Sequence, residues 1–164
     1  MPKKEYLHFY KRENPNGKIN RMNDSQIKDL LKNSKTIAMI GVSSEKKGED
    51  PKNLKRKPAN VVMKYMQDFG YKVIPINPFA EGEIINGEKV LSSLDKIKEK
   101  VDIVDVFRPS DQVLPIIKEA IKKKPKVIWL QEGIHNEEAE KIAKDAGIEV
   151  VYNRCMLAEH RRLA

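Results

Sequence analysis

The chain has 164 residues, of which 40% are apolar, enough to bury the core of one domain and too many for a disordered chain. No apolar run approaches the roughly 20 residues that cross a bilayer, and no apolar segment follows the charged N-terminus. The formal net charge of +8 favours an anionic partner: nucleic acid, a membrane surface or a phosphorylated small molecule. Only 6% of the residues are aromatic, which ranks nucleic acid below a phosphate-rich small ligand.

Residues 1–22 are polar and predict an N-terminal arm, while residues 23–164 predict a single domain. We expect Asp24 or Ser25 to cap a short first helix. The single cysteine, Cys155, builds no disulfide framework, which agrees with a reducing, cytoplasmic location and no secretory signal.

A regular alternation of strands and helices begins at residue 36. Residues 36–40 form a continuous apolar run that ends at Gly41, as in a strand buried on both faces. A helix is predicted from Pro58 to Gly70. Its expected apolar face consists of Val61, Val62, Tyr65, Met66 and Phe69. Residues 73–76 form a second strand, in which Pro75 indicates an edge position, a bulge or an interrupted ladder.

The second half of the chain repeats this alternation. Asn86-Gly87 predicts a hairpin turn, and Ser92 or Ser93 can cap a short helix through residue 98. Strands are predicted over residues 101–107, 126–130 and 148–152, with helices to about residue 123 and from Asn136 to residue 147. The pattern predicts an α/β fold: a Rossmann-type five-stranded parallel sheet with helices on both faces, plus short N- and C-terminal helices.

Such sheets bind ligands at the carboxyl ends of their strands. The first strand ends in Gly41-Val42-Ser43-Ser44, where a tight turn could offer N–H groups and hydroxyls to phosphate oxygens. The alternative is a glycine needed only for the turn. The next glycine is Gly48, so the G-x-G-x-x-G spacing of nicotinamide sites fails. Asn77-Pro78 ends the second strand, where such a site places an acid.

A basic loop follows the glycine turn, with six lysines and arginines against three acids over residues 45–57. Cations between a glycine turn and a helix N-terminus suit a ligand with several phosphates, although they could also serve only solubility. The third strand ends in Phe107-Arg108-Pro109, where Phe107 could offer an aromatic face and Arg108 a cation to a nucleotide. The alternative is that Phe107 is a core residue and Arg108 a surface charge. The fourth strand ends in Gln131-Glu132-Gly133, where Glu132 could accept a hydrogen bond from a ligand amide or hydroxyl, or cap the following helix.

Taken in order, these strand ends resemble the small single-domain CoA-binding protein family over about residues 35–163. The motifs are Ile40-Gly41-Val42-Ser43, Pro75-Ile76-Asn77-Pro78, Val104-Asp105-Val106-Phe107-Arg108, Trp129-Leu130-Gln131-Glu132-Gly133 and Asn153-Arg154-Cys155-Met156 with Glu159-His160. The domain is also similar to the N-terminal CoA-binding domain of the succinyl-CoA synthetase alpha subunit.

The resemblance implies a role for each strand end. Residues Gly41 to Ser44 would hold the CoA pyrophosphate, and Asn77-Pro78 would border the adenosine and its phosphate. Phe107-Arg108-Pro109 would line the adenine or pantetheine side, and Gln131-Glu132-Gly133 would close the pocket near the pantetheine. The family commonly has an Arg-Pro-Ser element soon after the glycine turn, whereas this chain has Lys57-Pro58-Ala59 after a longer loop. We therefore expect Arg56 or Lys57 to meet the phosphates.

The sequence shows no catalytic group and no metal-ligand spacing, since His8, His135 and His160 lie far apart. Cys155 could form a mixed disulfide with CoA or be a structural thiol. We expect a non-catalytic protein that binds CoA or an acyl-CoA as a carrier, sensor or regulatory subunit, with a second copy or an enzyme subunit as partner. The rivals are a CoA-dependent enzyme subunit, an NADP-binding reductase and a nucleic-acid-binding protein.

Overall fold

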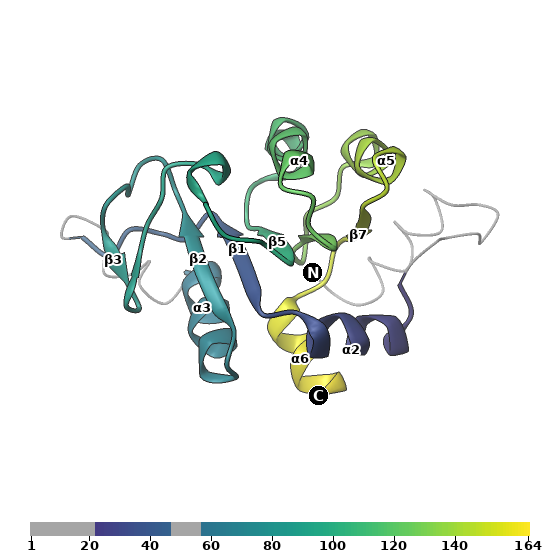
Figure 1. The fold of residues 1–164 in the computed structure, drawn as a ribbon, viewed down its shortest axis with the longest axis horizontal. Coiled ribbons are helices and arrows are strands. Elements are labelled where there is room, and N and C mark those ends of the chain that lie inside the picture. Colours follow the sequence, from purple (N-terminus) through teal and green to yellow (C-terminus); the bar gives the residue numbers. More distant parts are fainter. Residues whose placement is uncertain (1–21, 47–56) are drawn as a thin grey trace.

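The computed structural model describes residues 22–46 and 57–164. Five parallel strands form one sheet in the order β2-β1-β5-β6-β7 (Figure 1). Their bounds are β1 Thr36–Ile40, β2 Lys72–Ile76, β5 Ile103–Val106, β6 Val127–Leu130 and β7 Glu149–Val151. The predicted α/β sheet is confirmed. The predicted polar arm, apart from Met22, and the basic loop over residues 47–56 lie outside the described residues.

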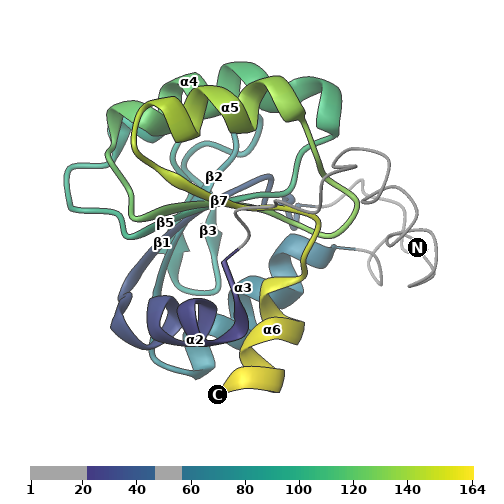
Figure 2. The ribbon, with the colours of Figure 1, turned by 90° about the vertical axis from the view of Figure 1, so that its right-hand side faces the viewer.

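Helices cover both faces of the sheet, as predicted (Figure 2). One face carries α4 (Val113–Lys122) and α5 (Glu137–Asp145). The other carries α2 (Asp24–Asn33), α3 (Pro58–Asp68) and α6 (Met156–Leu163). The three central strands are buried along nearly their whole length, because both faces of a parallel sheet are covered by crossover helices. Two apolar cores result, one on each side of the sheet.

Of the three explanations for Pro75, the edge position is confirmed, because β2 pairs within the sheet only with β1. The predicted turn at Asn86-Gly87 joins β3 (Ile84–Ile85) and β4 (Glu88–Lys89) into a small antiparallel hairpin. The remaining elements are the 3-10 turns η2 (Leu94–Lys96) and η3 (Ser110–Gln112). Ser93 occupies the N-cap position of η2, but its hydroxyl bonds the Asp95 carboxylate and caps no main-chain group.

The expected cap of the first helix is wrong, because Asn23 holds that position. Its Oδ1 accepts from the Gln26 N–H at 2.9 Å, and the Gln26 side chain accepts from the Asn23 N–H at 2.8 Å. This reciprocal pair satisfies two main-chain donors at once. Asp24 is thereby released to form a bidentate ion pair with Arg162 of α6, at 2.7 and 2.8 Å.

The expected apolar face of α3 is partly wrong. Val61 and Phe69 are 58% and 59% exposed. The buried residues are Ala59, Asn60, Val62, Met63 and Met66. The helix is thus rotated by about one residue from the predicted stripe, which brings the amide of Asn60 inward toward the end of β1.

Strand order reverses at β1, since the chain passes from β1 to β2 on one side and then to β5 on the other. The chain that leaves β1 continues into α3 on one face of the sheet, and the chain that leaves β5 continues into α4 on the other (Figure 2). A crevice therefore opens beyond the carboxyl ends of β1 and β5, the usual ligand position in sheets of this order.

Candidate ligand site at the carboxyl ends of β1 and β5

Gly41 makes the turn that leaves β1. Its φ is +98°, and an added Cβ would lie 2.4 Å from the carbonyl oxygen of Phe107. The two backbones are held this close by the hydrogen bond from the Phe107 N–H to the Ile40 oxygen at 2.9 Å, while the Gly41 N–H donates to the Ile76 oxygen of β2 at 3.0 Å. The glycine is therefore required by its approach to the end of β5 as well as by its dihedral angle.

The loop after Gly41 is held by side-chain amides. Asn60 accepts from the Ser43 N–H at 2.8 Å and donates to the Ser43 oxygen at 2.9 Å. Asn77 donates to the Val42 oxygen at 2.8 Å, and Lys57 Nζ donates to the Ser44 oxygen at 2.6 Å. Asn77, Lys57 and Asn60 come from the end of β2 and the start of α3, so they fix the loop from two sides.

The hydroxyl of Ser44, which was expected to bind phosphate, is instead hydrogen-bonded to Glu83. The Ser44 hydroxyl donates to the Glu83 carboxylate at 2.7 and 2.9 Å, and the Glu45 N–H lies 3.3 Å from the same group. Arg108, which lines both cavities described below, and the main chain remain as donors for an anion. The N–H groups of Val42 and Ser44 make no hydrogen bond to another described residue. The first turn of α3 offers further N–H groups, because the side chain of Lys57, its N-cap residue, makes no capping hydrogen bond to them.

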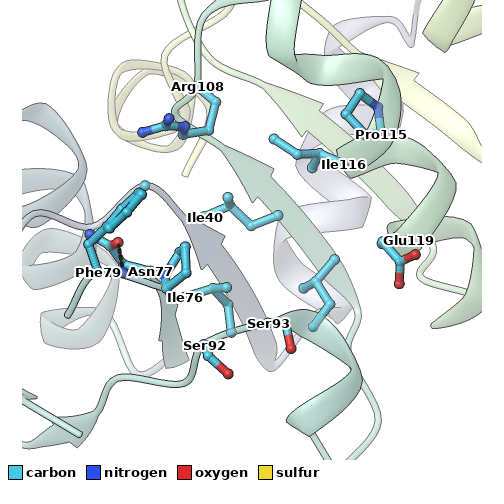
Figure 3. A pocket seen from close by; sticks show the side chains of 13 residues that line it. Ile40, Ile76, Asn77, Phe79, Ser92, Ser93, Arg108, Pro115, Ile116 and Glu119 are labelled. Carbon is cyan, nitrogen blue, oxygen red and sulfur yellow. Dashed lines mark hydrogen bonds between the residues drawn. The ribbon is translucent and has the colours of Figure 1, made fainter. Parts of the chain in front are cut away.

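Two cavities flank the glycine turn. The first has a volume of about 290 Å³ and lies between the end of β2 and α4. Figure 3 shows Ile40 and Ile76 on the sheet, Ile116 and Pro115 on α4, and Ser92 and Ser93 at the opposite rim. Its remaining lining residues are Gly41, Asn77, Pro78, Phe79, Leu94, Arg108 and Glu119. The apolar floor and the 90% exposed ring of Phe79 suit a flat aromatic group.

The second cavity has a volume of about 620 Å³ and lies on the α3 and α6 side of the sheet. Its lining residues are Gly41, Ser43, Pro58, Ala59, Val62, Phe107, Arg108, Pro109, Gln131, Glu132, Gly133, Ile134 and Cys155. Gly41 and Arg108 line both cavities. Arg108 is held at the boundary by Gln112, whose Oε1 accepts from Nε at 3.1 Å and from Nη2 at 2.6 Å.

The fold brings most of the predicted site residues together at these cavities. Val42, Ser44 and Lys57 line neither cavity; Val42 and Ser44 belong to the fixed loop, and the buried Lys57 holds that loop from the start of α3. Arg56, the other expected phosphate ligand, lies outside the described residues.

Sequence reasoning missed several residues of the site. Phe79 follows Asn77-Pro78 directly, and an aromatic residue beside a strand-end motif was an available signal. Asn60 is a polar residue among the buried positions of a helix, which was also visible in principle. Glu83 had no signal, because it lies 39 positions from Ser44 and beyond the end of β2.

Asp105 accepts a hydrogen bond from Gln131, which lines the second cavity. It is fully buried in β5, and this burial raises the pKa of its carboxyl to about 8, against the opposing effects of Gln131 and the Val106 N–H. Within residues 22–46 and 57–164, no cluster of three or more acidic, histidine or cysteine side chains could hold a metal ion. Over the same ranges, no helix has the length and apolarity needed to span a bilayer.

Comparison with known proteins identifies relatives of this chain. It is 35% identical over 136 residues to the uncharacterized protein YneT of Bacillus subtilis (strain 168), covering 83% of this chain and 93% of YneT. The structure of cell-free ID.343 from Thermus thermophilus is similar with a TM-score of 0.79 and 40% identity, covering 87% of this chain and 100% of that one.

A larger enzyme contains a similar unit. The chain matches the Ca. Korarchaeum cryptofilum dinucleotide forming acetyl-coenzyme A synthetase 1 with a TM-score of 0.58 and 28% identity, covering 77% of this chain and 28% of the synthetase. The family described as the CoA binding domain matches residues 35–161, which include both cavities and the glycine turn. The chain belongs to this CoA binding domain family.

Proposed function

We propose that the chain binds coenzyme A across the two cavities, with the pyrophosphate at the turn from Gly41 to Ser44. The observation that carries this proposal is the shared wall: Gly41 and Arg108 line both cavities and stand between them. Coenzyme A has the matching layout, with an adenosine at one end, a pantetheine at the other and a pyrophosphate between them. Family membership and the similarity to an acetyl-coenzyme A synthetase support the same ligand.

The chemistry of each cavity favours one orientation. The smaller cavity has an apolar floor and the exposed ring of Phe79, which suit the adenine. The larger one offers Gln131, Glu132 and Cys155 to the amides and the thiol of the pantetheine. The main-chain donors in the first turn of α3, which lines the second cavity, would meet the phosphate oxygens, with Arg108 as the cation.

The proposed role is that of a carrier, sensor or regulatory protein for CoA or an acyl-CoA. Its support is that the polar side chains around the glycine turn hold the loop: Asn60, Asn77 and Glu83 are all bonded to residues Val42 to Glu45. Such an arrangement fixes a binding surface in advance of the ligand.

Calorimetric titration of coenzyme A into the reduced protein at low salt tests the proposal, with Arg108→Gln as the first variant. We expect binding by the native chain and about tenfold weaker binding by this variant, because a cation at the pyrophosphate is removed. Arg161→Gln is the matched control, since it removes the same charge from an exposed position of α6. Equal losses from the two variants would mean that only net charge matters, and no binding by the native chain would refute the proposal.

Thermal shifts with coenzyme A, NAD and NADP separate the rival ligands. We expect coenzyme A to raise the melting temperature most, because a ligand that binds only the folded state stabilises it in proportion to its affinity. Selective stabilisation by NADP would favour a reductase. Native mass spectrometry of freshly purified protein would also identify a retained acyl-CoA by its mass.

A further inference from the structure

Asp105 stands at an unusual place for a carboxyl group. It lies in β5, the middle strand of the sheet, opposite Met39 of β1 and Trp129 of β6. Its side chain points to the same face as Ile103, toward α3 and α6, and is 0% exposed. Its Oδ2 atom has no hydrogen-bond partner among the described residues. A buried carboxyl group with an unpaired oxygen is costly and calls for a functional explanation.

Gln131 connects Asp105 to the ligand site. Its Nε2 donates to Asp105 Oδ1 at 2.6 Å, and its Oε1 accepts from the Met156 N–H at 3.2 Å. The two partners fix the amide in one orientation, since only the NH₂ group can donate to the acid. Gln131 lines the second cavity beside Cys155, the residue before α6. Asp105 thus supports one wall of that cavity without touching its interior.

We propose that Asp105 is a positioning residue of the coenzyme A site that works as a neutral acid: it holds Gln131 toward the start of α6, and ligand binding is coupled to its protonation. This inference rests on the proposed function. Burial supports it, because the raised pKa of about 8 keeps the group protonated at neutral pH.

Among the described residues, no neighbouring charge stabilises the ionised form of Asp105. The register neighbours are apolar, and α2 and α3 present mainly apolar side chains to this face. The titratable and charged residues that α3, α6 and the segment before α6 bring to this side are Lys57, Tyr65, Arg154, Cys155, Glu159 and His160. Arg154 is engaged by Glu159 at 3.1 Å and His160 by Tyr65 at 2.9 Å.

Two effects of ligand binding both favour the neutral form of Asp105. Coenzyme A carries several negative charges, which disfavour a nearby carboxylate, and a pantetheine in the second cavity excludes water from above Gln131. Binding is therefore expected to draw a proton onto Asp105. By linkage, affinity falls as pH rises through the range in which the free protein loses this proton.

Carbon-13 NMR titration of the Asp105 carboxyl tests this coupling directly in the native chain. We expect a titration midpoint far above that of an ordinary aspartate, and a further upward displacement when coenzyme A is added. A midpoint near 4, or one that coenzyme A leaves unchanged, would overturn the inference. Because this measurement uses no substitution, it holds even where a variant fails to fold.

Binding assays at several pH values provide the second readout. The probe is coenzyme A without its thiol, so the thiol of the ligand does not titrate. Between pH 7 and pH 9 we expect the native affinity to fall at least about threefold more than that of Asp105→Asn, whose neutral amide can still accept from Gln131. Parallel pH profiles for the two proteins would refute the coupling while leaving the proposed function intact. No binding at pH 7 by the native chain would refute the proposed function itself.

Discussion

At the residue scale, Gly41 is subject to two constraints that can be separated experimentally. Gly41 and Gly133 have similar positive φ angles, +98° and +84°, and both line the second cavity. An added Cβ would meet the Phe107 oxygen at 2.4 Å from position 41 and nothing within 4 Å from position 133. Gly133→Ala therefore carries the dihedral strain alone, and Gly41→Ala carries the strain together with a backbone clash.

We expect Gly133→Ala to lower the free energy of unfolding by about 1 kcal/mol and Gly41→Ala by about 3 kcal/mol or more. Urea denaturation of both variants measures this difference. Equal losses would show that the end of β5 moves away from position 41 at little cost. The sequence indicated a glycine turn here, but the contact that requires it comes from Phe107, 66 positions later, and local pattern carries no information about such distant backbone approaches.

At the element scale, the start of α3 determines the shape of the glycine loop. The apolar pattern predicted the helix and its first residue, Pro58, because those signals are local. It misjudged the buried face, because Val61 and Phe69 are apolar but exposed while the polar Asn60 is buried. Burial of Asn60 is compensated by its two bonds to Ser43, an interaction between elements that hydrophobic periodicity does not register.

This contact predicts a pH-dependent variant. In Asn60→Asp the ionised carboxylate can still accept from the Ser43 N–H. Its other oxygen, however, faces the Ser43 carbonyl and the Glu45 carboxylate, which lie 2.9 and 3.4 Å from Asn60 Nδ2 in the native chain. We expect a loss of about 2 kcal/mol or more in the free energy of unfolding at pH 7. Near pH 4 the protonated acid can donate to Ser43 again, so the loss should shrink.

Asn60→Ala is the control for this effect, because it removes both bonds and has no group to titrate. Its deficit relative to the native chain should be nearly the same at pH 4 and pH 7. If the Asp and Ala variants show the same pH dependence in urea denaturation, the contact between α3 and the loop is not the source of the effect.

At the scale of the whole molecule, the alternation of strands and helices was enough to predict a parallel sheet covered on both faces. Strand order was not predictable from the same pattern, because alternation does not say on which side of β1 the third parallel strand is placed. The observed order, β2-β1-β5-β6-β7, puts the glycine turn and Arg108 at the reversal point and so assembles the candidate site from four strand ends. The apolar cavity beside α4, with Phe79 at its rim, follows from that order.

The buried acid in the middle strand also makes a prediction for global stability. An aspartate in the unfolded chain has a pKa near 3.8, whereas burial in the native state raises that of Asp105 to about 8. Between these values the native state holds a proton that the unfolded state has released. The contribution of this group to stability is therefore complete below about pH 4 and is lost as pH rises toward 8, with a slope of at most about 1.4 kcal/mol per pH unit.

Asp105→Asn has the same shape and no proton to lose, so its free energy of unfolding should lack this slope. The native Asp24 and Asp102, whose pKa values are lowered, act in the opposite direction, but they are present in both proteins and cancel in the comparison. The stability of the Asn variant relative to the native chain should therefore increase steadily from pH 5 to pH 8 in urea denaturation. A constant difference over that range would mean that the carboxyl ionises at an ordinary pH, and that water reaches the centre of the sheet.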